Sequence, residues 1–323
     1  MATAKKTTTK TEASTVPELV ALQPLDAVQD TTQTPSNERQ QANPEVSLTH
    51  AHSIKNLGSL RAMEEDTMTL HTVEAMRIYL GVSPTPESSN KYGISGAKRA
   101  AAALRQLHVL TVKDNPYADW MLIQVDAMNA DAAKAIESME AKFTKKLESL
   151  KARGLSYSLV GSRTPQTVSL GYRSPYGFAV TNTVVGFDYM TRVLRSAELR
   201  DLMTKAELHS DLERIKGKLR GMFEFAAKAQ RILLNPLMQP LCRADYAAQD
   251  TDAAKRIAAA KQAFGDVPQP IFTHAQLPRH TLWNQRLSTA EREMLERIAN
   301  NQEQITTDVT MQDISQITSA GLV

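Results

Sequence analysis

The longest uninterrupted helical pattern in the chain runs from Asn115 to Ala152 and limits the folds that the sequence can adopt. Asn115 precedes Pro116, a pair typical of the first residues of a helix. Further along, apolar residues recur at helical spacing, namely Ile136, Met139, Phe143, Leu147 and Leu150. The pattern predicts one long helix, with a break near Asn129 left open. We interpret its apolar stripe as core-facing, and the alternative is a dimer seam.

Helical patterns also lie on both sides of this segment. Thr72 is a suitable N-cap for a helix from Val73 to Leu80, and Ser95 for a helix from Gly96 to Leu107. The later helices are expected at Phe187–Met203, Lys205–Leu234, Ala247–Ala263 and Ser288–Asn300.

Short strands are predicted between the helices. Thr67–Thr72 alternates polar and apolar residues, which is the two-residue period of a strand. Leu155–Val160 and Thr167–Tyr172 also have strand composition, and Phe178–Val185 is rich in Val and Thr. Ser174-Pro175-Tyr176-Gly177 has turn composition and predicts a hairpin. The fold class is therefore mainly α with a small antiparallel β element, and a doubly wound α/β fold is excluded.

The two ends of the chain differ from its middle. Residues 1–47 are rich in Thr, Ala, Gln and Pro, and they are interpreted as a disordered tail. Residues 48–299 are expected to form the helical domain, and residues 300–323 a polar C-terminal tail. The first residues lack the apolar core of a signal peptide, and no apolar run approaches about 18 residues. We therefore expect a cytoplasmic protein that makes no membrane contact.

The sequence lacks the usual motifs of catalysis and cofactor binding. It has no Gly-rich phosphate loop, no dinucleotide fingerprint and no Ser–His–Asp elbow. Gly93 and Gly96 are interpreted as a helix cap, and His50 and His52 as solvated residues of the tail. The single cysteine, Cys242, excludes a Cys-rich metal site and is interpreted as a buried structural thiol. We expect no catalytic residue, no metal and no cofactor.

Positive charge is concentrated in the middle of the chain. Residues 51–299 contain 34 basic and 26 acidic residues, although the net charge of the whole chain is only +3. Within the segment from Ala141 to Arg173 the only acidic residue is Glu148, whereas seven residues are basic: Lys142, Lys145, Lys146, Lys151, Arg153, Arg163 and Arg173. This segment is either a solvated face or a surface that contacts phosphates of double-stranded DNA.

Two strands compete as the element that reads DNA bases. In the first, next to the basic segment, alternation places Thr167, Ser169 and Arg173 on one face. The second is Thr67–Thr72, in which Thr67, Thr69 and His71 would face outward, and the alternative is an ordinary strand of the core. That strand is followed by two helices, which is the order of a ribbon-helix-helix module. The candidate DNA-binding residues are therefore Lys151, Arg153, Arg163, Thr167, Ser169, Arg173, Thr67, Thr69 and His71.

Four sequence blocks resemble a known family. They are Thr69-Leu70-His71-Thr72, Asn115-Pro116-Tyr117-Ala118-Asp119-Trp120, Ser174-Pro175-Tyr176-Gly177-Phe178 and Gly186-Phe187-Asp188. Together they are similar to the AcaB-like transcriptional regulators of conjugative plasmids and integrating conjugative elements, over roughly residues 55–245. Ser174 stands where relatives often have Asn. The resemblance implies a DNA-binding activator with a ribbon-helix-helix-like element that acts as a dimer, and it assigns no DNA-contacting residue.

The sequence therefore predicts a regulator of conjugative transfer genes that binds promoter DNA as a homodimer. The alternative is a non-enzymatic interaction or structural protein of the conjugation apparatus. Salt dependence separates these two functions, because phosphate contacts weaken steeply as salt rises and apolar helix docking does not.

Overall fold

The computed structural model describes residues 64–83, 93–155, 157–248, 250–285 and 287–300. The tails and the pair His50 and His52 lie outside these residues. The long helices are α3 (Ala97–Leu110), α4 (Pro116–Lys151), α5 (Pro175–Glu198) and α6 (Lys205–Leu233). The short elements are β1 (Thr67–Leu70), α2 (Val73–Leu80), β2 (Gly81–Val82), β3 (Ile94–Ser95), η1 (Thr111–Lys113), β4 (Gln166–Ser169), η2 (Arg243–Tyr246), α7 (Thr251–Phe264), α8 (Gln269–Phe272) and an unlabelled helix over 289–300.

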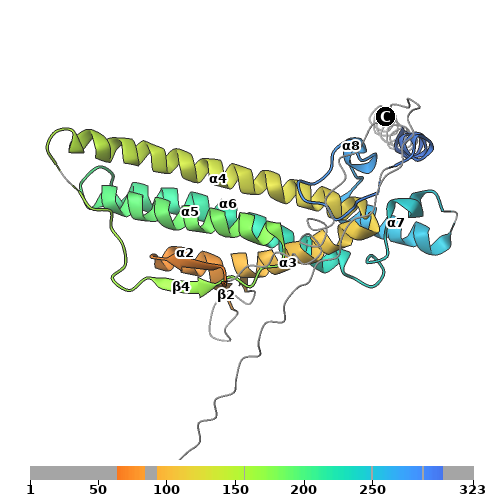
Figure 1. Ribbon diagram of the computed structural model, residues 1–323, viewed down its shortest axis with the longest axis horizontal. Helices are drawn as coiled ribbons and strands as arrows, with labels where there is room; N and C mark the ends of the chain where they lie inside the picture. The colour runs from red at the N-terminus through yellow and green to blue at the C-terminus, as the bar shows by residue number, and fades with distance from the viewer. Residues whose placement is uncertain (1–63, 84–92, 156, 249, 286, 301–323) are drawn as a thin grey trace, which may run out of the picture. The chain divides into compact units, whose positions relative to one another are not determined.

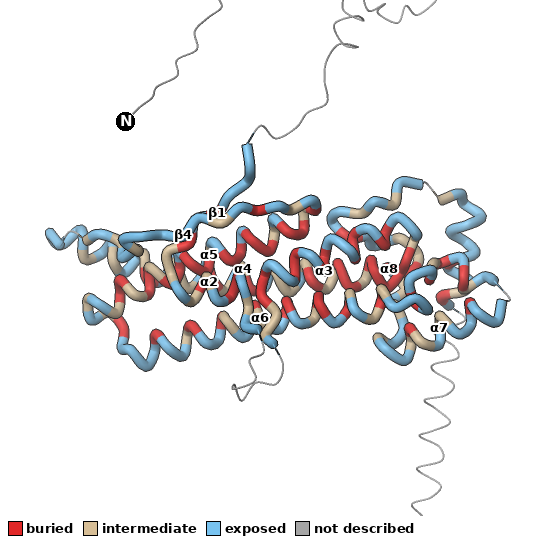
Figure 2. Tube along the Cα trace, turned by 90° about the horizontal axis from the view of Figure 1, so that it is seen from below, coloured by how far each residue is buried: buried red, intermediate tan, exposed pale blue. Residues whose placement is uncertain are grey.

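The four long helices pack side by side and enclose the core. Helix α4 contacts both α5 and α6, and α3 contacts the same two helices. Figure 1 shows α4, α5 and α6 running alongside one another, with α2 and β4 on the side of α5 away from α4. Buried residues follow the inward faces of these helices (Figure 2). The mainly helical fold with a small antiparallel sheet is therefore confirmed.

Local sequence signals account for several helix ends. The Thr72 side chain accepts a hydrogen bond from the amide of Ala75, so the predicted cap of α2 is confirmed. The side chain of Asn115 accepts from the amides of Tyr117 and Ala118 at the start of α4. Helix α6 begins with a capping box between Thr204 and Glu207.

Helix α3 begins at a different residue from the one predicted. Gly96, and not Ser95, is its N-cap, and Ser95 belongs to β3. A Cβ atom on Gly96 would lie 2.3 Å from the backbone nitrogen of Gly81, so only glycine allows β2 and β3 to approach this closely. The prediction of a glycine cap here is confirmed, with Gly96 as the residue.

Helix α4 is continuous over its 36 residues. The break near Asn129 that was left open does not occur within this described helix, and the Asn129 side-chain oxygen accepts a hydrogen bond from Thr183 of α5. Ile136 and Phe143 are buried in the core, and Met139 and Leu147 pack against it. The stripe therefore faces the core of its own chain, which confirms the core-facing interpretation.

The predicted hairpin is wrong. Phe178–Val185 lies within α5, and Leu155–Val160 contains no strand among its described residues. Pro175 occupies the first turn of this helix, where its missing amide costs nothing. Val180, Val184 and Phe187 are buried at helical spacing, so tertiary packing outweighs the β preference of the Val- and Thr-rich run.

Candidate nucleic-acid interface

The two strands that were predicted as alternative DNA-reading elements pair with each other. Strand β1 is antiparallel to β4, with Thr67 opposite Ser169 and Thr69 opposite Thr167. These four side chains are exposed, and the hydroxyl oxygens of Thr69 and Thr167 are 3.0 Å apart. We call these four residues the hydroxyl face. Ser and Thr hydroxyls both donate and accept hydrogen bonds, so this face offers groups that can pair with base edges.

The opposite face of the sheet fixes it to the helical core. Met68 and Leu70 are buried, and Val168 of β4 packs against the same cluster. The alternation predicted for β1 is therefore confirmed for Thr67, Met68, Thr69 and Leu70. Burial of one face also fixes the register, because a shift by one residue would expose the apolar side chains.

A buried carboxylate of α5 holds the junction between β1 and α2. The Oδ1 atom of Asp188 accepts hydrogen bonds from the His71 amide at 3.1 Å, the Thr72 amide at 2.8 Å and the Thr72 hydroxyl at 2.7 Å. Asp188 is 3% exposed, so these donors take the place of water around its charge. This role of Asp188 was not predicted, because a single aspartate within a helix gives no sign of a hydrogen-bond partner far along the chain.

His71 does not belong to the hydroxyl face. It follows the end of β1 and is half-buried, and its Nδ1 atom has no hydrogen-bond partner among the described residues. The predicted strand was expected to reach Thr72, whereas β1 ends at Leu70, so the alternation that grouped His71 with Thr67 and Thr69 does not extend to His71. The alternation ends because the chain turns into the α2 cap at Thr72.

Two of the predicted arginines flank the sheet. Arg163 and Arg173 are exposed and lie before and after β4. An acidic group is also close, because the Ser169 hydroxyl donates to Glu65 at 2.9 Å. The surface around the hydroxyl face therefore combines cations with at least one carboxylate at its edge.

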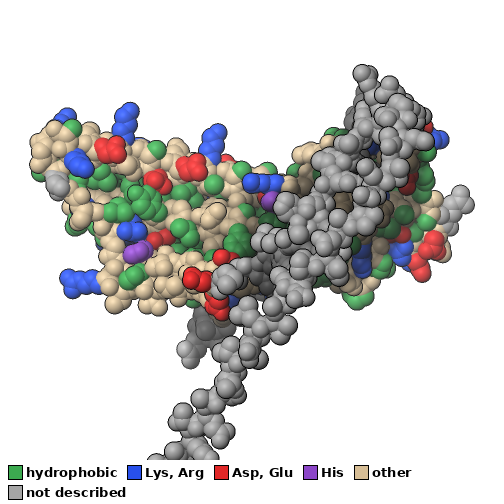
Figure 3. Space-filling model, in the orientation of Figure 1, with side chains coloured by type: hydrophobic (Ala, Val, Ile, Leu, Met, Phe, Trp, Pro, Cys, Tyr) green, Lys and Arg blue, Asp and Glu red, His purple; other side chains and the backbone are tan. Residues whose placement is uncertain are grey.

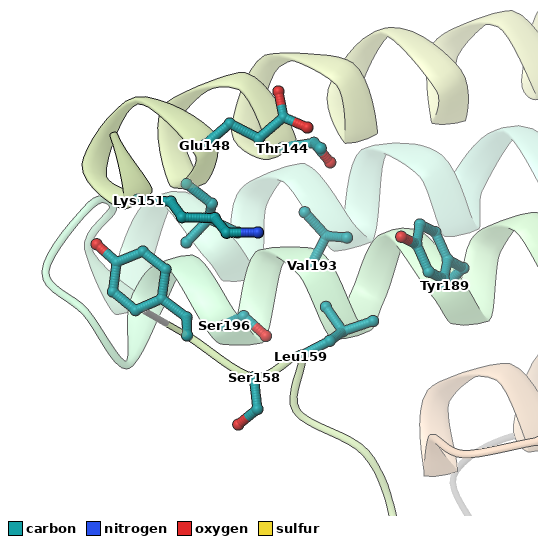
Figure 4. A pocket seen from close by; sticks show the side chains of 10 residues that line it. Thr144, Glu148, Lys151, Ser158, Leu159, Tyr189, Val193 and Ser196 are labelled. Carbon is teal, nitrogen blue, oxygen red and sulfur yellow. The ribbon is translucent and has the colours of Figure 1, made fainter. Parts of the chain in front are cut away.

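Lys151 and Arg153 lie elsewhere, at the C-terminal end of α4. Figure 1 shows α5 between this helix and β4, so the structure does not bring these two residues to the sheet. Lys151 lines a pocket of about 170 Å³ together with Leu147, Leu159 and Val193. In Figure 4 the Lys151 side chain extends from α4 toward Val193 of α5.

The remaining lysines of the basic segment are also on α4. Lys142 and Lys146 lie over the ring of Phe143, with their Nζ atoms 5.2 and 4.8 Å from its centroid. Figure 3 shows Lys and Arg side chains spaced apart along this view, with acidic side chains between some of them. The segment from Lys142 to Arg173 is continuous in sequence but is divided between two sides of α5.

One cluster of possible metal ligands is present among the described residues. Donor atoms of Asp114, Asp119 and His274 lie within 4.8 Å of one another. The guanidinium of Arg243 pairs with both carboxylates, and its distance to Asp119 Oδ2 is 2.9 Å. Because that guanidinium already pairs with both carboxylates, we interpret the cluster as an ion-pair network of the core. Cys242 is half-buried, so its expected full burial is not observed.

Among the described residues, no helix is both long enough and apolar enough to cross a membrane. The comparison with curated proteins gave no match. The chain is similar in structure to a protein described as selenomethionine-containing AcaB from uropathogenic E. coli, with 14% sequence identity and a TM-score of 0.38. That similarity covers 67% of this chain and 98% of the other. The family model described as "Transcriptional regulator AcaB" matches residues 56–283, well over half of the sequence. The chain therefore belongs to the AcaB family of transcriptional regulators.

Proposed function

We propose that this regulator binds promoter DNA sequence-specifically through the hydroxyl face of the β1–β4 sheet and activates conjugative transfer genes of a mobile element without enzymatic activity. The observation that carries the proposal is the row of four exposed hydroxyl side chains on a two-stranded antiparallel ribbon. The major groove of B-form DNA admits a ribbon of this kind. The family assignment supports the regulatory role.

The arginines and the hydroxyl side chains of the ribbon suit two different kinds of DNA contact. Arg163 and Arg173 can contact phosphates and so position the duplex, while the hydroxyl face contacts base edges. Lys151 and Arg153 are candidates for additional phosphate contacts beyond the ribbon. The elements β1, α2 and α3 follow one another as in a ribbon-helix-helix-like module, except that the short strands β2 and β3 stand between the two helices and the partner strand of β1 belongs to the same chain.

A promoter-binding assay tests this function. Wild-type protein should prefer DNA from the element's own promoters, and its affinity should fall as salt rises. The double substitution Thr69→Val and Thr167→Val removes two hydroxyls and keeps the β-branched shape. It should reduce the preference for promoter over unrelated DNA by at least about fivefold, because each lost hydrogen bond to a base edge contributes about 0.5–1.5 kcal/mol. Gel-shift titrations with both DNAs measure the ratio.

Matched variants control for charge and for hydroxyl loss elsewhere. Arg163→Gln with Arg173→Gln should reduce the salt slope by about 2 per chain, at about 0.9 for each phosphate contact. Lys151→Gln with Arg153→Gln removes the same amount of charge from the end of α4. Its effect on the salt slope measures how many phosphate contacts Lys151 and Arg153 make. Ser138→Ala with Ser210→Ala, at exposed positions of α4 and α6, should change neither quantity. Unchanged promoter preference in the double-valine variant would exclude the hydroxyl face as the reading surface.

We also propose that the protein acts as a homodimer. Strand β1 already has its partner strand in its own chain, so dimerisation is not needed to complete the ribbon. Support comes from exposed apolar side chains of α2 and β2, since Val73, Leu80 and Val82 are 62%, 58% and 44% exposed. Sedimentation at micromolar concentration should give about twice 35.7 kDa. A monomer both alone and on DNA would contradict the proposal.

A further inference from the structure

A pocket of about 220 Å³ lies between α3 and the segment that joins β4 to α5. One wall comes from Lys98 and Arg105 of α3, and the other from Ser169 and residues 171–174. No residue of this lining, all of it within the described part of the chain, is acidic. The pocket therefore has the charge and the size to hold a small anion.

Three cations reach this pocket from two separate parts of the chain. Lys98 and Arg105 are seven positions apart, close to two helical turns, so they project from the same side of α3. The short side chains of Ala101 and Ala102 line the pocket between them and leave the space open. Arg173 contributes the third cation from the opposite wall. None of the three cations forms an ion pair with a described carboxylate.

A buried hydroxyl without a partner points to the missing ligand. Ser174 is the N-cap residue of α5 and is 3% exposed, yet its Oγ atom makes no hydrogen bond to any described residue. An N-cap serine ordinarily accepts a hydrogen bond from the first turn of its helix, and buried hydroxyls are nearly always paired. Here the hydroxyl is free to donate to an anion. The 24-residue helix behind it adds the positive end of its dipole.

A second buried hydroxyl lies in the same pocket. The Tyr172 oxygen is buried next to the hydroxyl of Tyr79, which also lines the pocket and is placed to donate to it, so the hydrogen of Tyr172 is left to donate to a ligand. A Cβ atom at Gly177 would lie 2.9 Å from the Tyr172 ring, so glycine at this position lets the ring pack directly on the first turn of α5. The edge of the Phe178 ring, with centroids 5.6 Å apart, holds the tyrosine from another side. The tyrosine is therefore fixed beside Ser174.

The pocket adjoins the proposed DNA-reading surface. Ser169 belongs both to the pocket wall and to the hydroxyl face, where it lies opposite Thr67. The Ser169 hydroxyl donates to Glu65, so a carboxylate stands at the rim and opposes any anion that enters. A duplex whose groove received the ribbon would have its backbone phosphates next to this rim.

We propose that this pocket binds a phosphate group, and that the phosphate is a backbone phosphodiester of the DNA bound by the sheet. The ligand source rests on the proposed function, whereas the phosphate chemistry stands on the three cations and the unpartnered Ser174 hydroxyl alone. Lys98, Arg105 and Arg173 neutralise the phosphate, and Ser174 and Tyr172 donate hydrogen bonds to its oxygens. The phosphate anchors the duplex and fixes its register on the hydroxyl face.

Gel-shift titrations over a range of salt concentrations test the proposal. The variant Lys98→Gln with Arg105→Gln should reduce the salt slope by up to about 2 per chain and weaken promoter and unrelated DNA alike by at least about tenfold. Ser174→Ala should weaken binding by about fivefold to tenfold with an unchanged slope, because it removes a neutral donor. Glu65→Gln should strengthen binding, since it removes the opposing charge.

The matched control removes the same charges from another surface. Lys228→Gln with Arg231→Gln replaces one lysine and one arginine, both exposed on α6 and neither lining the pocket. This control should change the salt slope by less than half of the change caused by Lys98→Gln with Arg105→Gln. Circular dichroism and thermal unfolding verify that every variant is folded, and Ser174→Ala should keep the wild-type midpoint because its hydroxyl makes no hydrogen bond in the described structure.

Thermal unfolding in inorganic phosphate tests the pocket independently of DNA binding. Phosphate should raise the thermal unfolding midpoint of the wild-type protein above that in chloride of equal ionic strength, and the two pocket variants should lose this rise. Wild-type DNA binding with no effect of the pocket variants would overturn the inference while leaving the proposed function intact. No DNA binding by the wild type, together with a phosphate effect confined to an intact pocket, would overturn DNA as the source and identify a free phosphate ligand.

Discussion

Replacing Arg243 with alanine is expected to lower the free energy of unfolding by about 3–5 kcal/mol, the cost of leaving buried partners of an ion pair without their counter-charge. The arginine is 2% exposed and pairs with Asp114 and Asp119. It also donates to the carbonyl oxygens of Phe272 at 2.8 Å and Ile271 at 2.7 Å. One side chain therefore joins the start of α4 to α8. Urea unfolding followed by circular dichroism measures the loss.

The free energy of unfolding lost in the Arg243→Ala variant should become smaller as the pH falls. Burial raises the pKa of Asp119, and the charge of Arg243 partly offsets that rise. Without the arginine the folded-state pKa rises further above its unfolded value, so the ionised carboxylate destabilises the fold at neutral pH. Protonation removes this penalty as the pH falls through the raised pKa. The difference between wild type and variant should therefore shrink in mildly acidic buffer.

Two further variants test the origin of the effect. Arg231→Ala, at an exposed position of α6, removes the same charge and should cost less than about 0.5 kcal/mol. Combining Arg243→Ala with Asp119→Ala should cost less than the sum of the single changes, because the second removes the unpaired charge left by the first. Strict additivity would contradict the ion-pair interpretation.

Asp188→Ala should cost about 2–4 kcal/mol, because three donors lose one ionised acceptor in a buried site. The damage should be local. Hydrogen exchange should show β1 and α2 losing amide protection well before α3 and α4, since Asp188 ties the β1–α2 junction to α5. Asp188→Asn keeps an oxygen at the same place and should cost markedly less.

Glu224→Ala, at an exposed position of α6, serves as the acidic control and should leave exchange in β1 unchanged. If Asp188→Ala raised exchange equally in all elements, the carboxylate would contribute to global stability and not to the local attachment of the sheet. The same variant should weaken DNA binding more than its global stability loss explains, because the hydroxyl face depends on the position of β1.

Helix boundaries were predictable where local chemistry sets them. Thr72, Asn115 and the run from Lys205 each carry a signal within one helical turn, and each prediction agrees with the structure to within a residue or two. The first half of helix α5 was predicted as a strand because Val and Thr favour strands in isolation, whereas its second half, from Phe187, was predicted as helix. The spacing of Val180, Val184 and Phe187, which indicates a helix, was available in the sequence and was outweighed by composition.

For the candidate site, the sequence predicted which residues share a face of each strand but not that the two strands pair with each other. Alternation identified Thr67, Thr69, Thr167 and Ser169 as outward-facing residues, and nothing within either strand indicates that they pair with each other. The pocket cations Lys98 and Arg105 lie on a helix whose sequence reads as an ordinary amphipathic one. Such contacts between distant segments depend on the packing of α3 against α5, which one sequence without relatives does not report.

The pairing of β1 with β4 has a consequence for how the protein is made. Thr69 and Thr167 are 98 positions apart, so β1 leaves the ribosome long before its partner strand has been synthesised. Until then β1 is an unpaired strand edge, and contacts this distant in sequence form late because of the loop that must close. A nascent or truncated chain that ends within α4 therefore has no hydroxyl face. If the hydroxyl face reads DNA as proposed, this competence arises only after Ser169 has been synthesised, and incomplete copies of the chain are expected not to bind the promoters.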